Sequence, residues 1–507
     1  MPVASPSLRL LVATLAIAVS NSTLSAQSYR LERRGGEIGQ TLSIDLRGPN
    51  GSGFLLLPSL NAGPLPLAAL DPTDPRVLEV GLDLPDFLFT SVFGASTITL
   101  QYPIPNDSAL LGVVLHHHGF LFPGATRLAG EVCNPVRTTF GSSSAYVSRG
   151  AVLTNPTAIP TTSDLPDGRI LLAGGGSGSL LTARGLDTSE IYDPDRQRFT
   201  AGPKLGAARA LHQAVTLANG KVLLIGGANA QGAALATCEV YDPATNSFAP
   251  AASLATGRAG HTATLLKDGR VLVAGGSTNL VDAVSAIFGT VSSCEIYDPN
   301  SNTWSGARAM SRVRLGHAAT LLSNGQVLVC GGATVTIILP GVTNTAELYD
   351  PANNTWRGTG AMTYAAGAQI LQPLQDGRVL AIGGAVLAGI TNVASTNAST
   401  VYNPSTGTWA AAGVMRDSRA LPAVVRLPNG KVLAIGGAQG DITNPTALAR
   451  CESFDPATLA WSATVALGTA RAGTVALLRP EGLLFVVGGA GGSQNTALAT
   501  GEILYPR

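Results

Sequence analysis

The sequence predicts an all-β protein built from many short strands that are joined by tight turns. Gly accounts for 60 of the 507 residues and charged residues for only 12%, a composition that argues against disorder, coiled coil or a helical bundle. An apolar run that ends in Gly-Gly occurs seven times, and a Gly stands six residues before each pair. Repetition of this kind indicates one structural unit that is stacked against copies of itself.

The seven apolar runs are short and are separated by similar intervals. Successive Gly pairs lie 49 to 56 residues apart. In six copies Asp or Asn precedes the earlier Gly, which predicts a two-residue hairpin with positive φ at both central positions. The runs are Ile170–Gly175, Val222–Gly227, Val271–Gly276, Val327–Gly332, Val379–Gly384, Val432–Gly437 and Leu483–Gly489.

Aromatic residues complete each copy. The first aromatics, mostly in Tyr-Asp-Pro, are Tyr192, Tyr241, Tyr297, Tyr349, Tyr402, Phe454 and Tyr505. A second aromatic follows seven positions later in six copies, at Phe199, Phe248, Trp304, Trp356, Trp409 and Trp461. Each copy therefore reads as four strands, a to d, with strand b buried on both faces.

This pattern of an apolar run, Gly-Gly, Tyr and Trp resembles the kelch repeat family over residues 145–507. The resemblance implies a seven-bladed kelch-type β-propeller, with residues 144–507 as its domain. Residues 27–137 do not share the repeat; the alternation at Thr41–Arg47 and strand candidates at Val77–Val80, Ile98–Tyr102 and Leu110–Leu115 predict a small β-sandwich-like module.

Copy seven lacks a strand d, because the sequence ends two residues after Tyr505. Counting back 21 residues from the hairpin glycine of copy one leads to Val147. We therefore predict that residues 144–150 supply the missing outer strand of the last blade.

All variation in length falls in the connection between strands b and c, which runs from 14 to 21 residues. In a four-stranded meander the b–c and d–a connections share one face. Loops on a rigid scaffold commonly carry recognition, and two of them contain apolar runs, at Ala283–Phe288 and Thr334–Leu339. The candidate binding residues are therefore Ile287, Phe288, Ile337 and Ile338. The alternative is that these loops cover the channel mouth or pack against the N-terminal module.

Arg begins strand a in five copies. Glu stands two positions before the first aromatic in five copies and three positions before it in copy seven. A ring of arginines could bind an anion at the channel mouth; the other interpretation is a buried Arg–Glu pair that holds the strands in register. Copy five has Ala366 and Thr400 in place of both, which favours the structural pair. The residues are Arg209, Arg258, Arg314, Arg419 and Arg471, and Glu190, Glu239, Glu295, Glu347, Glu452 and Glu502.

Histidine and cysteine give weak metal signals. His212, His261 and His317 occupy one repeat position, and His116-His117-His118 has no neighbouring carboxylate, so we expect structural roles and a partly exposed strand for the second group. The five Cys residues are expected to be mostly buried and unpaired, because equivalent blade positions lie too far apart for a disulfide. We expect no cofactor and no metal.

An apolar segment from Leu8 to Val19, followed by small polar residues, predicts a signal peptide over residues 1–26. We therefore expect a secreted or periplasmic protein without membrane insertion once the peptide is removed. The net charge of +1 and the lack of a Lys/Arg cluster argue against nucleic acid as a partner.

The expected function is noncatalytic recognition of a glycan or protein through the b–c loops. The alternative is a carbohydrate-active enzyme of the galactose oxidase-like or sialic acid mutarotase-like kelch type, which the fold alone suggests. Galactose oxidase-like enzymes use an adjacent Tyr-His pair to bind copper, and this sequence contains no Tyr-His dipeptide. The sequence thus leans against an enzyme.

Overall fold

The computed structural model describes residues 29–506 and the backbone of Ala16–Val19. It leaves out residues 64, 70–73, 79, 81–83, 85–88, 123–130, 143–146, 178–183, 337–338, 388–392, 442–443, 480–481 and 493–494. Almost all regular structure in the described part is β-strand, which confirms the predicted class. The described helices are all too short to cross a membrane.

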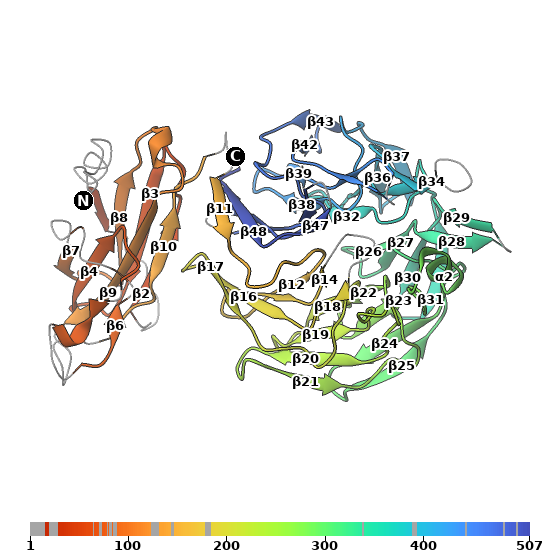
Figure 1. The fold of residues 1–507 in the computed structure, drawn as a ribbon, viewed down its shortest axis with the longest axis horizontal. Coiled ribbons are helices and arrows are strands. Elements are labelled where there is room, and N and C mark those ends of the chain that lie inside the picture. The colour runs from red at the N-terminus through yellow and green to blue at the C-terminus, as the bar shows by residue number, and fades with distance from the viewer. Residues whose placement is uncertain are drawn as a thin grey trace.

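The N-terminal module is a sandwich of two four-stranded antiparallel sheets (Figure 1). One sheet has the order β1 (Ala16–Val19), β8 (Thr97–Pro103), β3 (Thr41–Arg47) and β2 (Arg30–Arg34). The other has the order β10 (Val136–Thr139), β9 (Val114–Phe122), β4 (Gly53–Ser59) and β7 (Phe89–Val92). Alternate side chains such as Leu42 and Ile44 of β3 meet Phe54 and Leu56 of β4 in one core. The predicted signal peptide includes β1, and its removal stays a prediction.

The prediction of a strand from Leu110 was wrong. Residues Ser108–Leu110 form a short 3-10 helix, η3, because the Asp107 carboxylate caps it by accepting the Ala109 amide at 2.8 Å. Strand β9 begins only at Val114. The histidines on β9 are also more buried than expected, since His117 is 0% and His118 3% exposed. The same module holds η1 (Leu67–Ala69) and the pair β5 (Leu65–Pro66) and β6 (Val77–Leu78).

Seven four-stranded antiparallel meanders follow between Val147 and Leu504 in the described residues, and they are arranged as a propeller. The inner strands, a, are β12 (Thr161–Asp164), β18 (Gln213–Thr216), β22 (Thr262–Leu265), β26 (Ala318–Leu321), β32 (Ile370–Pro373), β38 (Ala423–Arg426) and β44 (Val475–Leu478). Strands b are β13 (Ile170–Ala173), β19 (Val222–Ile225), β23 (Val271–Ala274), β27 (Val327–Cys330), β33 (Val379–Ile382), β39 (Val432–Ile435) and β45 (Leu484–Val487).

The outer two strands of each meander follow in the same order. Strands c are β16 (Ser189–Asp193), β20 (Cys238–Asp242), β24 (Cys294–Asp298), β30 (Ala346–Asp350), β36 (Ser399–Asn403), β42 (Cys451–Asp455) and β48 (Thr500–Leu504). Strands d are β17 (Arg198–Ala201), β21 (Ser247–Ala251), β25 (Thr303–Ala307), β31 (Thr355–Thr359), β37 (Thr408–Ala411), β43 (Ala460–Ala463) and, for the last blade, β11 (Val147–Ala151).

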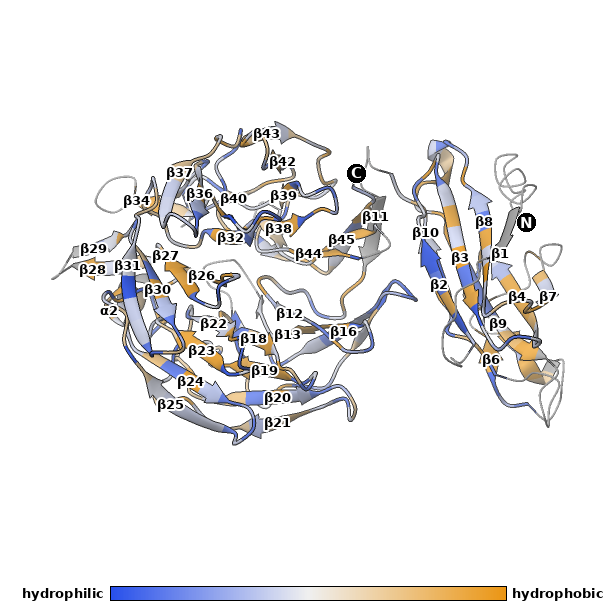
Figure 2. Cartoon of the chain, turned by 180° about the vertical axis from the view of Figure 1, so that it is seen from behind, coloured by the Kyte–Doolittle hydropathy of each residue, from blue (hydrophilic) through white to orange (hydrophobic). Residues whose placement is uncertain are grey.

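Burial explains why strand b is apolar at successive positions. Every residue of β19, β23, β27, β33 and β39 is buried, because each blade packs against a neighbour on both faces. Figure 2 shows these middle strands as hydrophobic segments inside the ring. The predicted Tyr–Trp pairs also meet, with ring centroids 5.1 Å apart for Tyr297 and Trp304.

The a–b hairpins differ from the prediction in one respect. In copy one, Leu165 accepts the Gly168 amide and donates its own amide to Arg169, which encloses three loop residues instead of two. Gly168 has φ +85°, whereas Asp167 does not have positive φ. The Asp167 carboxylate accepts the Arg169 amide at 3.0 Å and so stabilises the turn with a left-handed Gly at its end.

Strand β11 closes the ring over residues 147–151, which confirms that the segment predicted at residues 144–150 supplies the outer strand; residues 144–146 lie outside the described residues. Strand β11 pairs with β48 through Val147–Ile503, Ser148–Glu502 and Arg149–Gly501, so the last blade takes its outer strand from the beginning of the domain. The amide of Ile159 also donates to the carbonyl of Gly473, which joins the first and last blades near the axis.

Candidate functional site

Five copies bury an Arg–Glu ion pair of the same geometry. Each Arg pairs with the Glu of its own copy, and all five arginines are 0% exposed. The pairs are Arg209–Glu239 at 2.5 Å, Arg258–Glu295 at 2.8 Å, Arg314–Glu347 at 2.9 Å, Arg471–Glu502 at 3.3 Å and Arg419–Glu452. The guanidinium groups are therefore enclosed by protein, and an anion site built on them would require these pairs to open.

Each of these arginines joins two blades. In copy three, Arg258 Nη1 donates to the carbonyls of Gly275 at 3.0 Å and Ser293 at 2.9 Å within its own blade. Its backbone amide donates to Leu235, and its carbonyl accepts the Gly227 amide, both in the preceding copy. The residue thus fixes a blade to its neighbour through the backbone and orders its own blade through the side chain.

Copies one and five lack the arginine, and other side chains occupy its place in each. In copy five, Thr400 replaces the Glu, and the Tyr364 hydroxyl donates to the Gly383 carbonyl at 3.1 Å. In copy one, Thr157 replaces the Arg, but Glu190 is retained and buried. Burial raises the pKa of the Glu190 carboxyl. The Asn155 amide donates to Oε1 at 3.0 Å, and Oε2 has no hydrogen-bond partner.

The three propeller histidines lie between blades. The His212 ring packs against Gly174 of the preceding copy so closely that a Cβ added to this glycine would lie 2.8 Å from Cε1. The His317 ring packs against Gly275 in the same way. Nε2 lies 2.9 Å from a threonine hydroxyl of the preceding copy, Thr161 for His212 and Thr262 for His317. Burial lowers the pKa of both histidines to about 3.

No group of three or more His, Cys, Asp or Glu side chains is placed to hold a metal ion within the described ranges. All five cysteines are buried and form no disulfide among the described residues, which confirms the expectation that equivalent blade positions do not pair as disulfides.

Seven residues with positive φ surround the axis at the start of strand a. They stand two positions after the Arg position and are Ile159, Leu211, Gly260, Gly316, Ala368, Leu421 and Gly473. Amides of this ring donate to carbonyls of the preceding blade, as Gly316 does to Gly260 at 2.9 Å. Non-glycine residues in this conformation store backbone strain of about 1–3 kcal/mol each. Leu211 is 39% exposed there.

The b–c connections form a second tier on one face of the propeller. Most are small hairpins: β14 (Gly176–Ser177) with β15 (Arg184–Gly185), β28 (Ala333–Thr336) with β29 (Leu339–Val342), β34 (Ala385–Leu387) with β35 (Val393–Ser395), β40 (Ala438–Gln439) with β41 (Thr446–Ala447), and β46 (Ala490–Gly491) with β47 (Thr496–Ala497). Copy three instead has a helix, α2 (Ala283–Phe288).

Neighbouring connections contact each other from copy two round to copy one. A bridge joins Ala233 of copy two to Asn279 of copy three, and α2 contacts β28 of copy four. The contacts β29–β34, β35–β40, β41–β46 and β14–β47 continue the series. We call this series of connections the b–c rim.

The candidate loop residues lie on this rim. Ile287 is half-buried on α2, and Phe288 at its end is 54% exposed; Val281 just before the helix is 65% exposed. Ile337 and Ile338 lie outside the described residues. Figure 1 places α2, β28 and β29 on the side of the propeller far from the N-terminal module. The alternative that these two loops pack against the module was therefore wrong.

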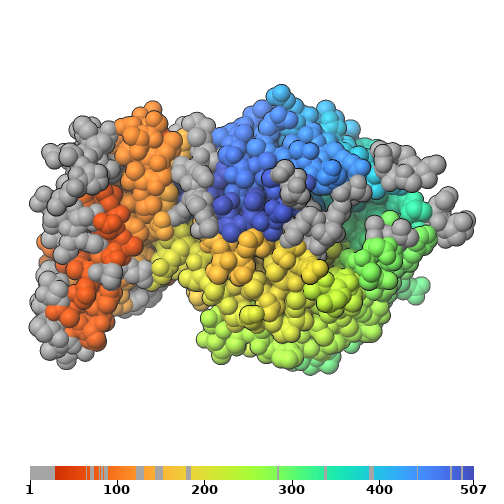
Figure 3. Space-filling view, viewed as in Figure 1, coloured from red at the N-terminus to blue at the C-terminus, as the bar shows by residue number. Residues whose placement is uncertain are grey.

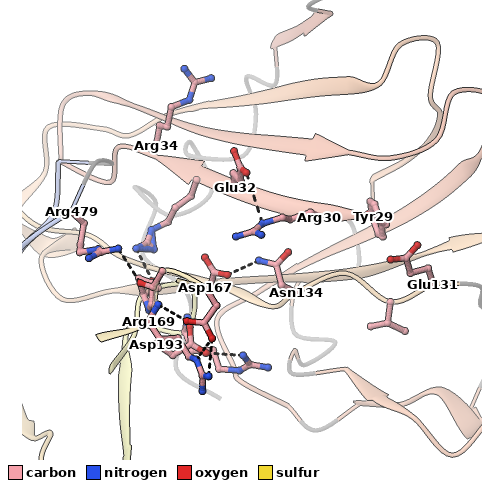
Figure 4. Close-up of a pocket in the computed structure, with 16 residues that line it drawn as sticks. Tyr29, Arg30, Glu32, Arg34, Glu131, Asn134, Asp167, Arg169, Asp193 and Arg479 are labelled. Atoms are coloured by element: carbon pink, nitrogen blue, oxygen red, sulfur yellow. Dashed lines mark hydrogen bonds and ion pairs between the residues drawn. The ribbon is translucent and has the colours of Figure 1, made fainter. Parts of the chain in front are cut away.

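A polar cavity of about 720 Å³ lies where the N-terminal module meets copy one (Figure 3). Figure 4 shows that its walls are charged on both sides. The lining side chains include Arg30, Glu32 and Arg34 of β2 and Asp167, Arg169 and Asp193 of copy one. Most of these charges are paired locally, as Arg169 is with Asp167 at 2.7 Å and Arg34 with Asp45 at 2.8 Å. The walls therefore present a balanced polar surface and no field of one sign.

The module is attached through the c–d turn of copy one, which the sequence reasoning missed. Gln197 is 2% exposed, and its side-chain oxygen accepts the Thr139 amide at 2.9 Å. The side-chain amide of Asn134 donates to the Asp195 carboxylate at 2.9 Å, and the Arg33 guanidinium donates to the Pro194 carbonyl at 2.9 Å. Copies two to four have Asn at the repeat position of Gln197. The presence of Gln in copy one was therefore the sequence feature that could have indicated a special role for this turn.

Comparison with known proteins supports the architecture. The model of the Kelch motif matches residues 209–255, which correspond to one sequence copy. Copy two therefore carries a Kelch motif, and the four-stranded sheets of the described residues are arranged as a β-propeller, as the sequence predicted. Among curated proteins no sequence matches the chain.

The many solved structures that resemble the chain include the following two. One is a novel fungal alcohol oxidase of the AA5 family in complex with copper, with a TM-score of 0.57 and 18% identity over 71% of this chain and 76% of that chain. The other is the structure of YjhT, with a TM-score of 0.47 and 16% identity over 62% of this chain and 98% of that chain. The likeness to the oxidase shows a shared fold and nothing about activity.

Proposed function

We propose that the protein is an exported, noncatalytic recognition protein that binds a glycan or protein ligand on the b–c rim. The observation that carries the proposal is the exposed apolar surface of Val281 and Phe288 on a rim that is continuous between neighbouring blades. Loops on a rigid scaffold are favoured sites of recognition, and exposed apolar side chains commonly mark contacts.

The test is a glycan array combined with the double variant Val281→Ser and Phe288→Ser. Both side chains are exposed, so the melting temperature should stay near that of the parent protein while ligand capture falls. Val92→Ser is the matched control, because Val92 is 59% exposed on β7 of the N-terminal module. Equal capture by the double variant and the parent would place the binding surface elsewhere.

A carbohydrate-active enzyme of the galactose oxidase-like or sialic acid mutarotase-like type is the second candidate. The fold shared with the copper-containing fungal oxidase favours it. A copper titration followed by spectroscopy for a tyrosyl radical tests the oxidase branch, and a radical signal that develops with copper would replace the noncatalytic proposal. Following the interconversion of sialic acid anomers by NMR tests the mutarotase branch.

A further inference from the structure

Copy one retains the oxygen atoms that bind a guanidinium group in other copies. In copy three, the Arg258 guanidinium donates to the Gly275 carbonyl, the Ser293 carbonyl and Glu295 Oε1. The counterparts in copy one are the Gly174 carbonyl, the Thr188 carbonyl and Glu190. The backbone frame is the same, since Gly275 donates its amide to Ser293 at 3.2 Å and Gly174 donates to Thr188 at 2.9 Å.

The arginine itself is replaced by a much shorter side chain. Thr157 Oγ1 reaches only the Gly174 carbonyl, at 3.1 Å. Glu190 is 5% exposed and its Oε2 atom has no partner. A buried carboxylate without a neighbouring cation lowers the stability of the folded state, because burial removes its hydration. Thr157 is 7% exposed, whereas the five arginines at this position are 0% exposed, so the shorter side chain leaves this position less completely covered.

Copy five shows how the same loss is accommodated without an acceptor site. Its Glu position holds Thr400, whose hydroxyl donates to the Ala410 carbonyl at 2.7 Å. Tyr364 there donates to the Gly383 carbonyl, in place of the arginine. Copy five has therefore lost the carboxylate together with the arginine, while copy one has kept it.

We propose that copy one is a binding site for a guanidinium group carried by a ligand, with Glu190 as the anionic partner. A planar guanidinium offers several N–H donors in fixed directions, which match a carboxylate and two carbonyl oxygens as the protein's own arginines do. An ammonium group carries the same charge but lacks this planar set of donors. The inference does not depend on ligand binding at the b–c rim.

The experiment measures the melting temperature of the full protein against millimolar methylguanidinium, with methylammonium and tetramethylammonium as matched cations. Binding to the folded state alone raises the melting temperature in a saturable manner. We expect such a rise with methylguanidinium, a smaller one with methylammonium and none with tetramethylammonium. A flat or unsaturable response to methylguanidinium overturns the proposal.

Two variants locate the effect. Thr157→Arg supplies the missing guanidinium, so it should raise the melting temperature without ligand and abolish the response. Glu190→Gln keeps the shape but removes the charge, and its affinity for methylguanidinium should fall by at least about tenfold, in line with a charge-assisted hydrogen bond. An unchanged response in Thr157→Arg would show that the cation binds elsewhere, even if Glu190→Gln failed to fold.

Arg258→Thr provides a positive control inside the same chain. It recreates in copy three the arrangement of copy one, with Glu295 left unpaired. The variant should be less stable than the parent protein, and methylguanidinium should restore more of its melting temperature than it adds to the parent. A loss that methylguanidinium does not recover would show that these oxygen atoms do not accept a free guanidinium, and the proposal would fail.

Discussion

The Tyr505 hydroxyl donates to the carbonyl of Thr139 at 3.2 Å, although 366 residues separate them. Tyr505 follows β48, the strand that pairs with β11, and Thr139 ends β10 of the N-terminal module. A Cβ on Gly141 would lie 2.8 Å from the Tyr505 ring, so the close approach needs a residue without a side chain. The strand pair that closes the ring therefore lies directly against the N-terminal module, and we call this contact the seam.

The first prediction concerns ring closure. Replacing residues 147–151 with Gly-Pro-Gly-Pro-Gly keeps the length of the connection but removes the native side chains of β11 and the amide N–H groups at positions 148 and 150, so the segment no longer favours a paired strand. We expect a fall in melting temperature of many degrees, because an unpaired β48 becomes an open strand edge and each ~1 kcal/mol corresponds to about 2–4 °C. Differential scanning calorimetry measures the change, and an unchanged curve would reject the closure.

The second prediction concerns the seam between the module and copy one. Gln197→Asn restores the residue of copies two to four but shortens the side chain by one methylene, so the Thr139 amide loses its acceptor. A buried unsatisfied amide costs about 1–3 kcal/mol. Hydrogen exchange should therefore become faster at Thr139, whereas Asn246→Gln, the reverse change in copy two, should leave that amide protected. Equal protection in both variants would contradict the assigned contact.

Much of the propeller could be predicted because it repeats. The hairpin glycine stands six residues before every Gly pair, and the second aromatic stands seven residues after the first in six copies. The apolar run predicted to begin at Ile170 is strand β13, which begins at that residue. The N-terminal module was harder to predict, because it occurs only once. Its strands had to be assigned from local sequence alone, without a second copy for comparison. The apolar residues that follow Leu110 indicate a strand, but Leu110 itself belongs to the 3-10 helix η3, which Asp107 caps.

The site depended on departures from the repeat. The pairing of Arg with Glu within one copy follows from the common loss of both in copy five. The mismatch of Thr157 with Glu190 was also visible in the sequence, but the burial of Glu190 and its unpartnered oxygen required the structure. The contacts along the b–c rim could not be predicted, because these loops differ in length and their packing is decided in three dimensions.

The third prediction concerns the Arg258–Glu295 pair. Arg258→Ala and Glu295→Thr should each cost about 3–5 kcal/mol, because each leaves a buried charge without its partner. The double variant should lose less than the sum, with a coupling energy within the 0.5–3 kcal/mol range of contacting pairs. Urea unfolding of the four proteins measures the cycle. Additive losses would show that the pair does not stabilise the fold and would reopen the arginine ring as a ligand site.

The last prediction concerns acid stability. Burial lowers the pKa of His117, His212 and His317 to about 3, and burial together with Arg258 lowers the pKa of His261 well below its ordinary value. Each histidine is neutral in the folded state and takes up a proton on unfolding below its ordinary pKa near 6.5. The unfolded state then binds more protons, so stability falls as the pH decreases from 6.5 toward 3, by up to about 1.4 kcal/mol per pH unit for each histidine.

Glu190 and Asp195 act in the opposite direction. Burial raises the pKa of both carboxyl groups, and in Asp195 the neighbouring Asp193 adds to the rise, so their protonation in the folded state adds stability as the pH falls through that raised range. Because four histidines oppose two carboxyl groups, the histidines dominate the pH dependence of stability between pH 6.5 and 5. The free energy of unfolding in urea should therefore decrease across this interval.

His261→Gln isolates one histidine. Glutamine already occupies this repeat position in copy five, where Gln369 Nε2 donates to the Cys330 carbonyl at 2.9 Å, so the fold accommodates it. The variant should take up about one proton fewer on unfolding than the parent protein. The slope of the free energy of unfolding against pH should therefore fall by about 1.4 kcal/mol per pH unit. Leu211→Ala is the matched control at a neighbouring position without a titratable group, and its slope should equal that of the parent protein. If His261→Gln kept the parent slope, His261 would already be protonated in the folded state and its neutral burial would be wrong.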